Sequence, residues 1–298
     1  MNKSEHFKSG FVAVVGRPNV GKSTMINALI GDKIAIVSDK AQTTRNRIIC
    51  VYTDEEKQIV FMDTPGVHKP KHKLGEFMVE AAIESLKETE AVLFVVAGNE
   101  KRGPGDNFII EQLKRVKVPV FLVVNKIDTL QKEQVLEAIV SYQDAYPFAG
   151  VIPISAKNKD NLEELLNVLS KNLPEGPQYF PEDMITDQPE RLIISDIVRE
   201  KILLSTRDEI PHAIAVDVDE MKTRDDGTTY IRATIYCERD SQKGIIIGKK
   251  GALLKQLGAE ARADIQKLLA TKVYLDLWVK VKKDWRNRSG MLSELGYQ

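Results

Sequence analysis

The segment from Gly16 to Ser23 fits the pattern G-x-x-x-x-G-K-S, in which a glycine-rich turn cradles phosphate groups. It follows the apolar run 11–15 and precedes the helix-like run 24–29. A strand before the turn and a helix after it direct several backbone N–H groups and the helix N-terminus at one anion. We therefore expect Lys22 to reach the outer phosphates of a nucleotide and Ser23 to bind Mg²⁺. The residues expected to line this loop are Gly16, Arg17, Pro18, Asn19, Val20, Gly21, Lys22, Ser23 and Thr24.

A second pattern, Asp63-Thr64-Pro65-Gly66, directly follows the apolar run 59–62. A carboxylate at the carboxyl end of a strand can hold Mg²⁺ through water, which makes Asp63 a candidate metal ligand beside Ser23. Gly66 can offer its backbone N–H to a terminal phosphate. Taken singly, Asp63 is equally typical of a turn. Placed after the phosphate loop, the four residues Asp63, Thr64, Pro65 and Gly66 predict the other wall of a phosphate site.

Two further patterns predict that the base is guanine. Asn125-Lys126-Ile127-Asp128 follows the run 119–124, and Asp128 can accept the two N–H donors on the pyrimidine edge of guanine. Adenine lacks that pair of donors, so it would leave a buried carboxylate unpaired. We expect Lys126 to lie along the base and Asn125 to tie its loop to the phosphate loop. After the run 151–154, Ser155, Ala156 and Lys157 are expected to present a backbone N–H to the guanine carbonyl.

Length and composition indicate a folded protein of two domains. The chain has 298 residues, of which 43% are hydrophobic, and no run approaches the ~18 apolar residues of a membrane span. Residues 1–9 are polar and lack the apolar stretch of a secretory signal, which predicts a cytoplasmic location. Cys50 and Cys237 have no C-x-x-C partner, so we expect two small buried side chains rather than a disulfide or metal site.

Strand-like and helix-like runs alternate through residues 11–172, which predicts an α/β fold with a mostly parallel sheet and helices on both faces. The runs 46–53 and 57–62, joined by a polar turn, predict a hairpin that adds one antiparallel edge strand. Proline-rich residues then interrupt every regular pattern. The predicted boundaries are a nucleotide-binding domain at 1–173, a linker at 174–190 and a second domain at 191–298.

The second domain reads as a helix, two strands, a helix, a Gly-Lys-Lys-Gly turn, a helix and a strand. The helices are predicted at 191–207 and 252–270, the hairpin strands at 213–218 and 229–237, and the last strand at 272–282. A G-x-x-G turn between two helices allows close approach of a nucleic-acid backbone. Residues 243–288 also hold 12 Lys or Arg against four acids, within a chain whose net charge is zero. Clustering of this kind is typical of nucleic-acid binding, although a solvated helix face gives the same signal.

Over nearly its whole length the chain resembles Era, a family of bacterial ribosome-assembly GTPases that join a Ras-like P-loop domain to a type II KH domain. The resemblance implies hydrolysis of GTP to GDP with Mg²⁺. It also implies binding of the 3′ end of 16S ribosomal RNA in the small subunit, and a role in 16S rRNA processing and 30S particle maturation. By the same resemblance the RNA groove is expected at Lys243, Ile247, Gly248, Lys249, Lys250, Gly251 and Lys255. The protein is expected to be a monomer.

The resemblance also bears on hydrolysis. Gln42-Thr43-Thr44-Arg45 matches the effector loop of the family, where one threonine closes on Mg²⁺; we favour Thr44, with Thr43 left open. Val67 stands where many signalling GTPases have a glutamine that positions water, so intrinsic hydrolysis should be slow. Relatives with Asn at position 19 hold K⁺ against the phosphates, which suggests K⁺ as a cofactor. The expected catalytic residues are Lys22, Thr44, Gly66 and Asn19, with Ser23, Thr44 and Asp63 on the metal.

Three alternatives keep parts of this interpretation. A membrane-peripheral GTPase switch in growth or cell-cycle control would use the KH domain for protein or membrane contacts, with the basic stretch 280–288, Trp278 and Trp285 meeting an anionic inner cell-membrane surface. A plain RNA-binding protein with an inert nucleotide domain is disfavoured by the intact Lys22 and Asp63. An adenine-nucleotide enzyme is disfavoured by Asp128.

Overall fold

The computed structural model describes residues 6–38, 40, 43–67, 70 and 72–297. The chain divides into two compact units. The first comprises Met1–Ala35, Thr44–Lys71 and Gly75–Asp187, and the second comprises Ile36–Thr43, His72–Leu74 and Gln188–Gln298.

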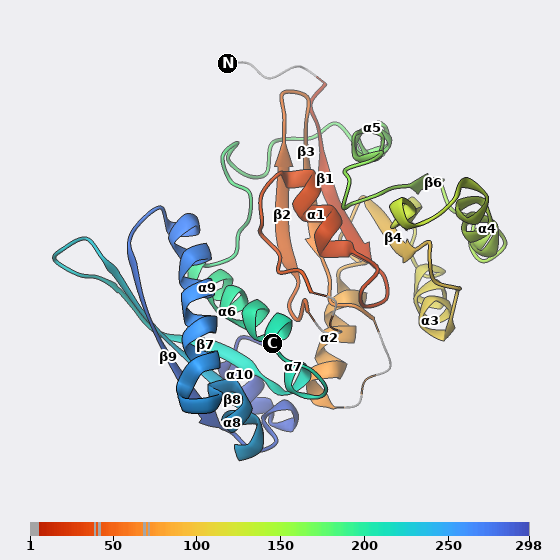
Figure 1. Ribbon diagram of the computed structural model, residues 1–298. Helices are drawn as coiled ribbons and strands as arrows, with labels where there is room; N and C mark the ends of the chain where they lie inside the picture. The colour runs from red at the N-terminus through yellow and green to blue at the C-terminus, as the bar shows by residue number, and fades with distance from the viewer. Residues whose placement is uncertain (1–5, 39, 41–42, 68–69, 71, 298) are drawn as a thin grey trace. The chain divides into compact units, whose positions relative to one another are not determined.

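The first unit is built on a six-stranded sheet with the order β2-β3-β1-β4-β5-β6 (Figure 1). Neighbouring strands run parallel except β2 and β3, which form an antiparallel hairpin at one edge. The predicted fold class, a mostly parallel P-loop sheet with one antiparallel edge strand, is therefore confirmed. The strands are β1 (Lys8–Val15), β2 (Ile48–Thr53), β3 (Lys57–Asp63), β4 (Ala91–Ala97), β5 (Val120–Asn125) and β6 (Gly150–Pro153).

Helices cover both faces of this sheet because alternate strand residues bury apolar side chains on opposite sides. Val12 and Val14 of β1 belong to one core, with α1 (Lys22–Ile30) and α5 (Leu162–Asn172) packed on it. Ala13 and Val15 belong to the other core, under α2 (Lys73–Glu84), α3 (Pro104–Leu113) and α4 (Lys132–Gln143). A short 3-10 turn, η1 (Ile127–Thr129), follows β5.

The second unit is a three-stranded sheet, β7-β8-β9, with helices on one face. β7 and β8 are antiparallel, whereas β8 and β9 are parallel. Ile194, Ile246 and Leu257, from three different helices, meet in the core under the sheet. The expected type II KH arrangement is present. Its elements are α6 (Glu190–Ser205), α7 (Ile210–Ala213), β7 (Ala215–Thr223), β8 (Thr229–Cys237), α8 (Asp240–Ile247), η2 (Lys249–Gly251), α9 (Ala252–Leu269), β9 (Val273–Val281), η3 (Trp285–Asn287) and α10 (Ser289–Glu294).

The division between the units differs from the expected linker. Residues 174–187 cluster with the first unit, where their backbone and the side chain of Gln58 are hydrogen-bonded. The Gln58 side-chain oxygen accepts the backbone N–H groups of Tyr179 and Phe180 at 2.8 and 2.9 Å. Val51 of the edge strand β2 donates its N–H to the carbonyl of Ile185 at 2.9 Å. The proline-rich segment therefore lies along the first unit and covers part of its edge strand.

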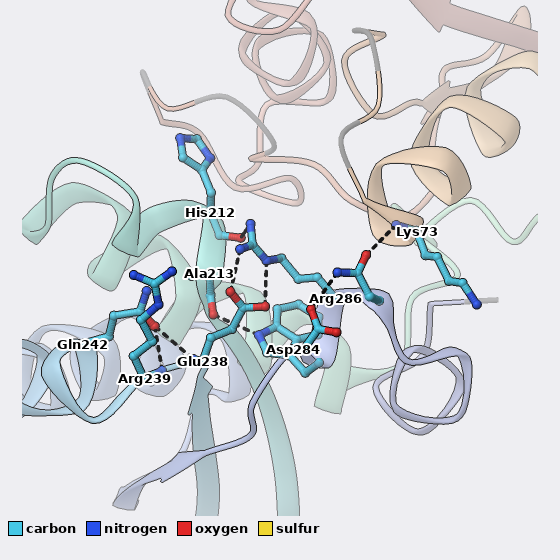
Figure 2. Close-up of polar contacts among 10 residues, drawn as sticks. Lys73, His212, Ala213, Glu238, Arg239, Gln242, Asp284 and Arg286 are labelled. Atoms are coloured by element: carbon cyan, nitrogen blue, oxygen red, sulfur yellow. Dashed lines mark hydrogen bonds and ion pairs between the residues drawn. The ribbon is translucent and has the colours of Figure 1, made fainter.

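The interpretation of Trp285 as a membrane-facing residue is wrong. Trp285 is fully buried, and its indole N–H donates to the carbonyl of Ala213 at 2.9 Å. The neighbouring Arg286 forms a bidentate salt bridge with Glu238, with N–O distances of 3.0 and 2.6 Å (Figure 2). Both contacts hold the segment after β9 against its own unit. Among the residues that the structure describes, no helix has the length and hydropathy needed to cross a bilayer.

Each unit holds one cysteine, and both cysteines are free and buried. Cys50 lies on β2 in the core of the first unit, and Cys237 ends β8 in the core of the second. Burial raises the pKa of both thiols above the ordinary value. The expected role as small core side chains is confirmed for both.

Candidate nucleotide site and nucleic-acid groove

The phosphate loop, residues 16–23, connects β1 to α1 and packs against Asn125 at the end of β5. Gly21 has φ of +96°, and a Cβ there would stand 2.2 Å from the side-chain nitrogen of Asn125. Only glycine fits this approach. The backbone N–H of Val67 donates to the Gly16 carbonyl at 3.1 Å, which draws the Asp63–Gly66 turn to the same loop. The structure therefore brings the first three predicted patterns together at the carboxyl edge of the sheet.

Lys22 lies inside the loop with its ammonium directed at backbone carbonyls. It donates to the carbonyls of Gly16 and Arg17 at 3.2 and 3.1 Å. Burial lowers the pKa of Lys22 from 10.5 to about 8, although the Asp63 charge acts in the opposite direction. An ammonium that is desolvated and held by neutral carbonyls is poised to gain a phosphate as its counter-ion.

The predicted metal ligands lie within hydrogen-bonding distance of one another. The Ser23 hydroxyl donates to Asp63 Oδ2 at 2.7 Å and lies 2.9 Å from the Thr44 hydroxyl. Burial raises the pKa of the Asp63 carboxyl, with Lys22 opposing the shift. The second Asp63 oxygen, Oδ1, is buried and has no hydrogen-bond partner among the residues that the structure describes. A buried carboxylate with this oxygen available, beside two hydroxyl oxygens, fits Mg²⁺, which takes hard oxygen ligands.

Thr43 and Thr44 have different surroundings. The Thr44 hydroxyl lies beside Ser23 and 3.4 Å from Asp63 Oδ2, whereas the Thr43 hydroxyl donates to the Lys40 carbonyl at 2.6 Å. This geometry favours Thr44 as the metal ligand. Gln42 of the same predicted loop lies outside the described residues.

Asn125 joins the guanine-side segments. Its side-chain nitrogen donates to the Val20 carbonyl at 2.9 Å, and its side-chain oxygen accepts the backbone N–H of Ala156 at 3.0 Å. The Ser155 hydroxyl donates to Asp128 Oδ1 at 2.7 Å and so orients the carboxylate expected to read guanine. The fourth predicted pattern thus lies beside the third. Lys157 and Asn19 are exposed at this edge.

One contact that positions the phosphate loop, between Arg17 and Asp106, has no signature in the sequence. Arg17 donates to the buried carboxylate of Asp106 at 2.9 Å, and another of its nitrogens lies 2.9 Å from Glu100. Asp106 also caps α3 by accepting the N–H of Gly103 at 2.8 Å. The loop is therefore braced against the N-terminus of α3. An Asp in the first turn after Gly103-Pro104 indicates a helix start, but nothing in the sequence pairs it with Arg17.

The second unit contains a groove beside its Gly-Lys-Lys-Gly turn. Gly248 has φ of +74° and ψ of 175°, and a Cβ there would meet Leu253 Cβ at 2.8 Å. Lys249 and Lys250 are exposed at the turn. A hollow of about 400 Å³ lies between α9 and β9. Its walls are Gly251, Leu254, Lys255, Gly258, Ala259, Arg262, Leu275 and Leu277.

This groove includes two of the predicted RNA residues, Gly251 and Lys255. Lys249, Lys250 and Gly248 form the adjoining turn, and Ile247 and Lys243 are half-buried on α8, where Ile247 packs against the core. Sequence reasoning missed Arg262 and the small Gly258 of α9. Gly258 and Arg262 follow Lys255 by three and seven residues, a spacing that would have placed them on the same helix face.

In comparisons with known proteins, one family profile matches part of each unit. A sequence profile described as a 50S ribosome-binding GTPase matches residues 11–126, and a KH domain profile matches residues 209–286. A solved structure of an Era variant from Aquifex aeolicus, bound to GDP and AlF4⁻, is 44% identical and has a TM-score of 0.94. The match covers 98% of this chain and 99% of that one. A structure of Era with MgGDPNP and nucleotides 1506–1542 of 16S ribosomal RNA is also 44% identical, with the same coverage and a TM-score of 0.95.

Fold and site together define a P-loop GTPase that carries a KH domain. The phosphate loop, the Asp63 turn and Asn125 are held by contacts within one unit, and the Gly-Lys-Lys-Gly turn belongs to the other. The chain belongs to the Era family.

Proposed function

We propose that this protein hydrolyses GTP and binds the 3′ end of 16S rRNA in its KH groove, as a GTP-timed factor in 16S rRNA processing and maturation of the 30S particle. The observation that carries the proposal is the combination in one chain of a complete guanine-nucleotide site and a Gly-Lys-Lys-Gly groove. The related Era structure with MgGDPNP and nucleotides 1506–1542 supports the choice of RNA. A cytoplasmic location follows from this role, whereas a peripheral membrane fraction stays a prediction from the family resemblance.

The residues of the nucleotide site have different roles in GTP binding and hydrolysis. Ser23, Thr44 and Asp63 would hold Mg²⁺, which neutralises charge on the phosphates when it is bound. Lys22 gives its ammonium to the outer phosphates, and the Gly66 N–H faces the terminal one. Asp128, oriented by Ser155, accepts the guanine donors. Val67 is buried in the apolar core, so it offers no polar group to position water. Intrinsic turnover is therefore expected to be slow.

Potassium is expected to accelerate this slow step through Asn19. Asn19 has φ of +64° and is exposed on the phosphate loop, where its side-chain oxygen can help hold a cation against the phosphates. GTP turnover measured with the same protein should be faster in KCl than in NaCl of equal ionic strength. An Asn19→Ala variant should lose the difference while still binding GDP. Equal rates in the two salts would contradict the role of K⁺.

Nucleotide state can reach the second unit through the effector segment. Residues 36–43 belong to that unit, where Arg199 donates to the Thr43 carbonyl at 2.6 Å and Glu200 accepts the Val37 N–H at 3.0 Å. The next residue, Thr44, stands with Ser23 and Asp63. Because one peptide bond joins Thr43 to Thr44, ordering Thr44 on the metal acts on a segment that Arg199 and Glu200 hold.

The test is binding of RNA nucleotides 1506–1542 with a GTP analogue, with GDP or without nucleotide. We expect tight binding that exceeds binding of a scrambled RNA of equal length and that is strongest with the GTP analogue. Binding no tighter than that of the scrambled RNA would overturn the RNA function. Selective binding with one affinity in all three states would retain the RNA function and overturn the timing by GTP.

A further inference from the structure

The outer face of the second unit's sheet, opposite its helices, carries aromatic side chains together with basic and acidic ones. Val273, Leu275, Leu277 and Val279 of β9 pack into or against the core, so the alternate residues point outward. Rows across β8 and β9 pair Tyr230 with Tyr274, Arg232 with Asp276, and Thr234 with Trp278. We call the set Tyr230, Arg232, Tyr274, Asp276 and Trp278 the outer platform.

Two rings of the platform are exposed and fixed in orientation. Trp278 is 53% exposed, and its indole N–H donates to Asp276 at 3.0 Å. Tyr274 is 52% exposed and stacks on Tyr230, with ring centroids 5.8 Å apart and planes inclined by 16°. Exposed aromatic faces that gather on one surface mark candidate interaction sites. These two are held ready with their positions already fixed, which reduces the entropy lost on binding.

Cationic groups surround the two stacked tyrosine rings of the platform. The Arg224 guanidinium lies 4.8 Å from the Tyr230 centroid and 5.0 Å from that of Tyr274. Lys222 and Arg232 approach the Tyr230 ring at 5.4 and 5.6 Å. Acids share this face: Glu220 pairs with Lys222 at 2.7 Å, and Asp276 accepts from Arg232 at 3.2 Å. Asp217 and Asp219 of β7 lie beside Thr234, in the row of Trp278. Planar rings edged by guanidinium and ammonium groups match a strand of stacked bases and phosphates.

The platform is continuous with the groove because both use β9. In the sheet order β7-β8-β9 this strand is at the edge, beside β8. Leu275 and Leu277 line the groove on one face of β9, and Tyr274 and Trp278 stand on the other. A chain that leaves the groove beside β9 reaches the platform by crossing a single strand.

We propose that single-stranded RNA longer than the groove crosses the edge of β9 and stacks successive bases on Trp278 and Tyr274. The proposal rests on the proposed RNA function and extends it to a second RNA-binding surface. Stacking requires a planar face and tolerates any base, so the platform lengthens the bound RNA without adding strong sequence selection. Arg224 and Lys222 then meet the phosphates beside the stacked bases.

The test uses RNAs of two lengths. The short probe is the tightest-binding member of a tiled set of fragments of about four nucleotides, the length that a G-x-x-G turn clamps, cut from nucleotides 1506–1542 of 16S rRNA. The long probes extend it stepwise at either end. Extension at one end should tighten binding. Trp278→Ala should lower the affinity for the long probe by about 5- to 150-fold. The same variant should bind the short probe as the unchanged protein does.

Three comparisons separate stacking from other effects. Trp278→Phe keeps a planar ring and should restore most of the lost affinity, whereas Trp278→Leu keeps only apolar bulk and should not. The other tryptophan, Trp285, is buried, so quenching of the exposed Trp278 fluorescence by the long probe reports stacking directly. GTP turnover of each variant should equal that of the unchanged protein, which shows that the fold is intact.

The outcomes distinguish the two proposals. Binding of the short probe without any gain on extension at either end overturns the platform and leaves the RNA function standing. A gain on extension that survives both Trp278→Leu and Tyr274→Ala also overturns it. Failure of every probe, together with the full segment 1506–1542, overturns the RNA function and the platform with it.

Discussion

Replacement of Lys22 by alanine should lower GTP affinity by about 10²- to 10⁴-fold, the worth of two hydrogen bonds between a charged donor and phosphate. The ammonium is buried, and among the described residues its hydrogen bonds go to two backbone carbonyls, with the Asp63 charge nearby. Holding it charged below pH 8 costs the folded protein about 3 kcal/mol, because its pKa falls from 10.5 to about 8. Titration calorimetry with GTP and Mg²⁺ measures the loss. Lys22→Met, which keeps the aliphatic bulk, should lose as much affinity as alanine.

The lowered pKa of Lys22 predicts a pH dependence of GTP binding that general misfolding would not produce. A phosphate beside Lys22 favours the protonated form, so GTP binding should take up protons between about pH 8 and 10, and affinity should fall as pH rises through that window. The unfolded chain has the higher pKa, so the stability cost is fully present below pH 8 and disappears as pH rises toward 10.5. Both pH effects should vanish in Lys22→Met. Unchanged GTP affinity in that variant would remove Lys22 from the site.

Gly248→Asp should weaken RNA binding by about 10²-fold or more while GTP affinity stays unchanged. The backbone there, with φ of +74° and ψ of 175°, is a conformation almost confined to glycine, and forcing another residue into it costs about 1–3 kcal/mol. The new Cβ would also collide with Leu253. The turn must therefore change shape, and the added carboxylate repels phosphate. Fluorescence anisotropy with labelled RNA 1506–1542 gives the affinity.

Gly290→Asp provides the matched control, because it adds the same charge at an exposed glycine of α10 where a Cβ meets nothing within 4 Å. Its RNA affinity should be close to that of the unchanged protein. An equal loss in both variants would show that charge on the unit, and not the turn, governs binding. Simultaneous loss of GTP binding in Gly248→Asp would indicate general unfolding instead.

The strands of the first unit could be predicted closely because they are buried on both faces. β4 and β5 are continuous apolar runs, so their ends, and the polar residues that follow, are visible in the sequence. α4 is different: Tyr142 is its buried residue, and Leu136 and Val140 are each 62% exposed. Ala138 and Ile139 are only partly buried where they pack on the core, so the helix has a weak apolar stripe for periodicity to detect.

The errors concern contacts between residues that are distant in sequence. Trp285 lies within a basic stretch that is typical of a surface, yet it is buried and its indole N–H donates to the Ala213 carbonyl, 72 positions earlier. Arg17 and Asp106 likewise meet only because the phosphate loop and α3 share one edge of the sheet. The Gly-Lys-Lys-Gly turn was recognised, but the opposite wall of its groove, Leu275 and Leu277, comes from an alternating strand that reads only as core. The local sequence pattern predicts the helices and strands, whereas the tertiary contacts between them are set by the fold.

The reactivity of the two cysteines can be used to follow unfolding of each unit separately. Cys50 and Cys237 are the only thiols in the sequence, and one is sealed in each core. A buried thiol with a raised pKa reacts with alkylating reagents only when its surroundings open. Peptide mapping after brief alkylation in increasing denaturant would therefore give two separate opening curves. Coincident curves would mean that the GTPase and KH units melt together, and divergent ones that each unit sets its own stability.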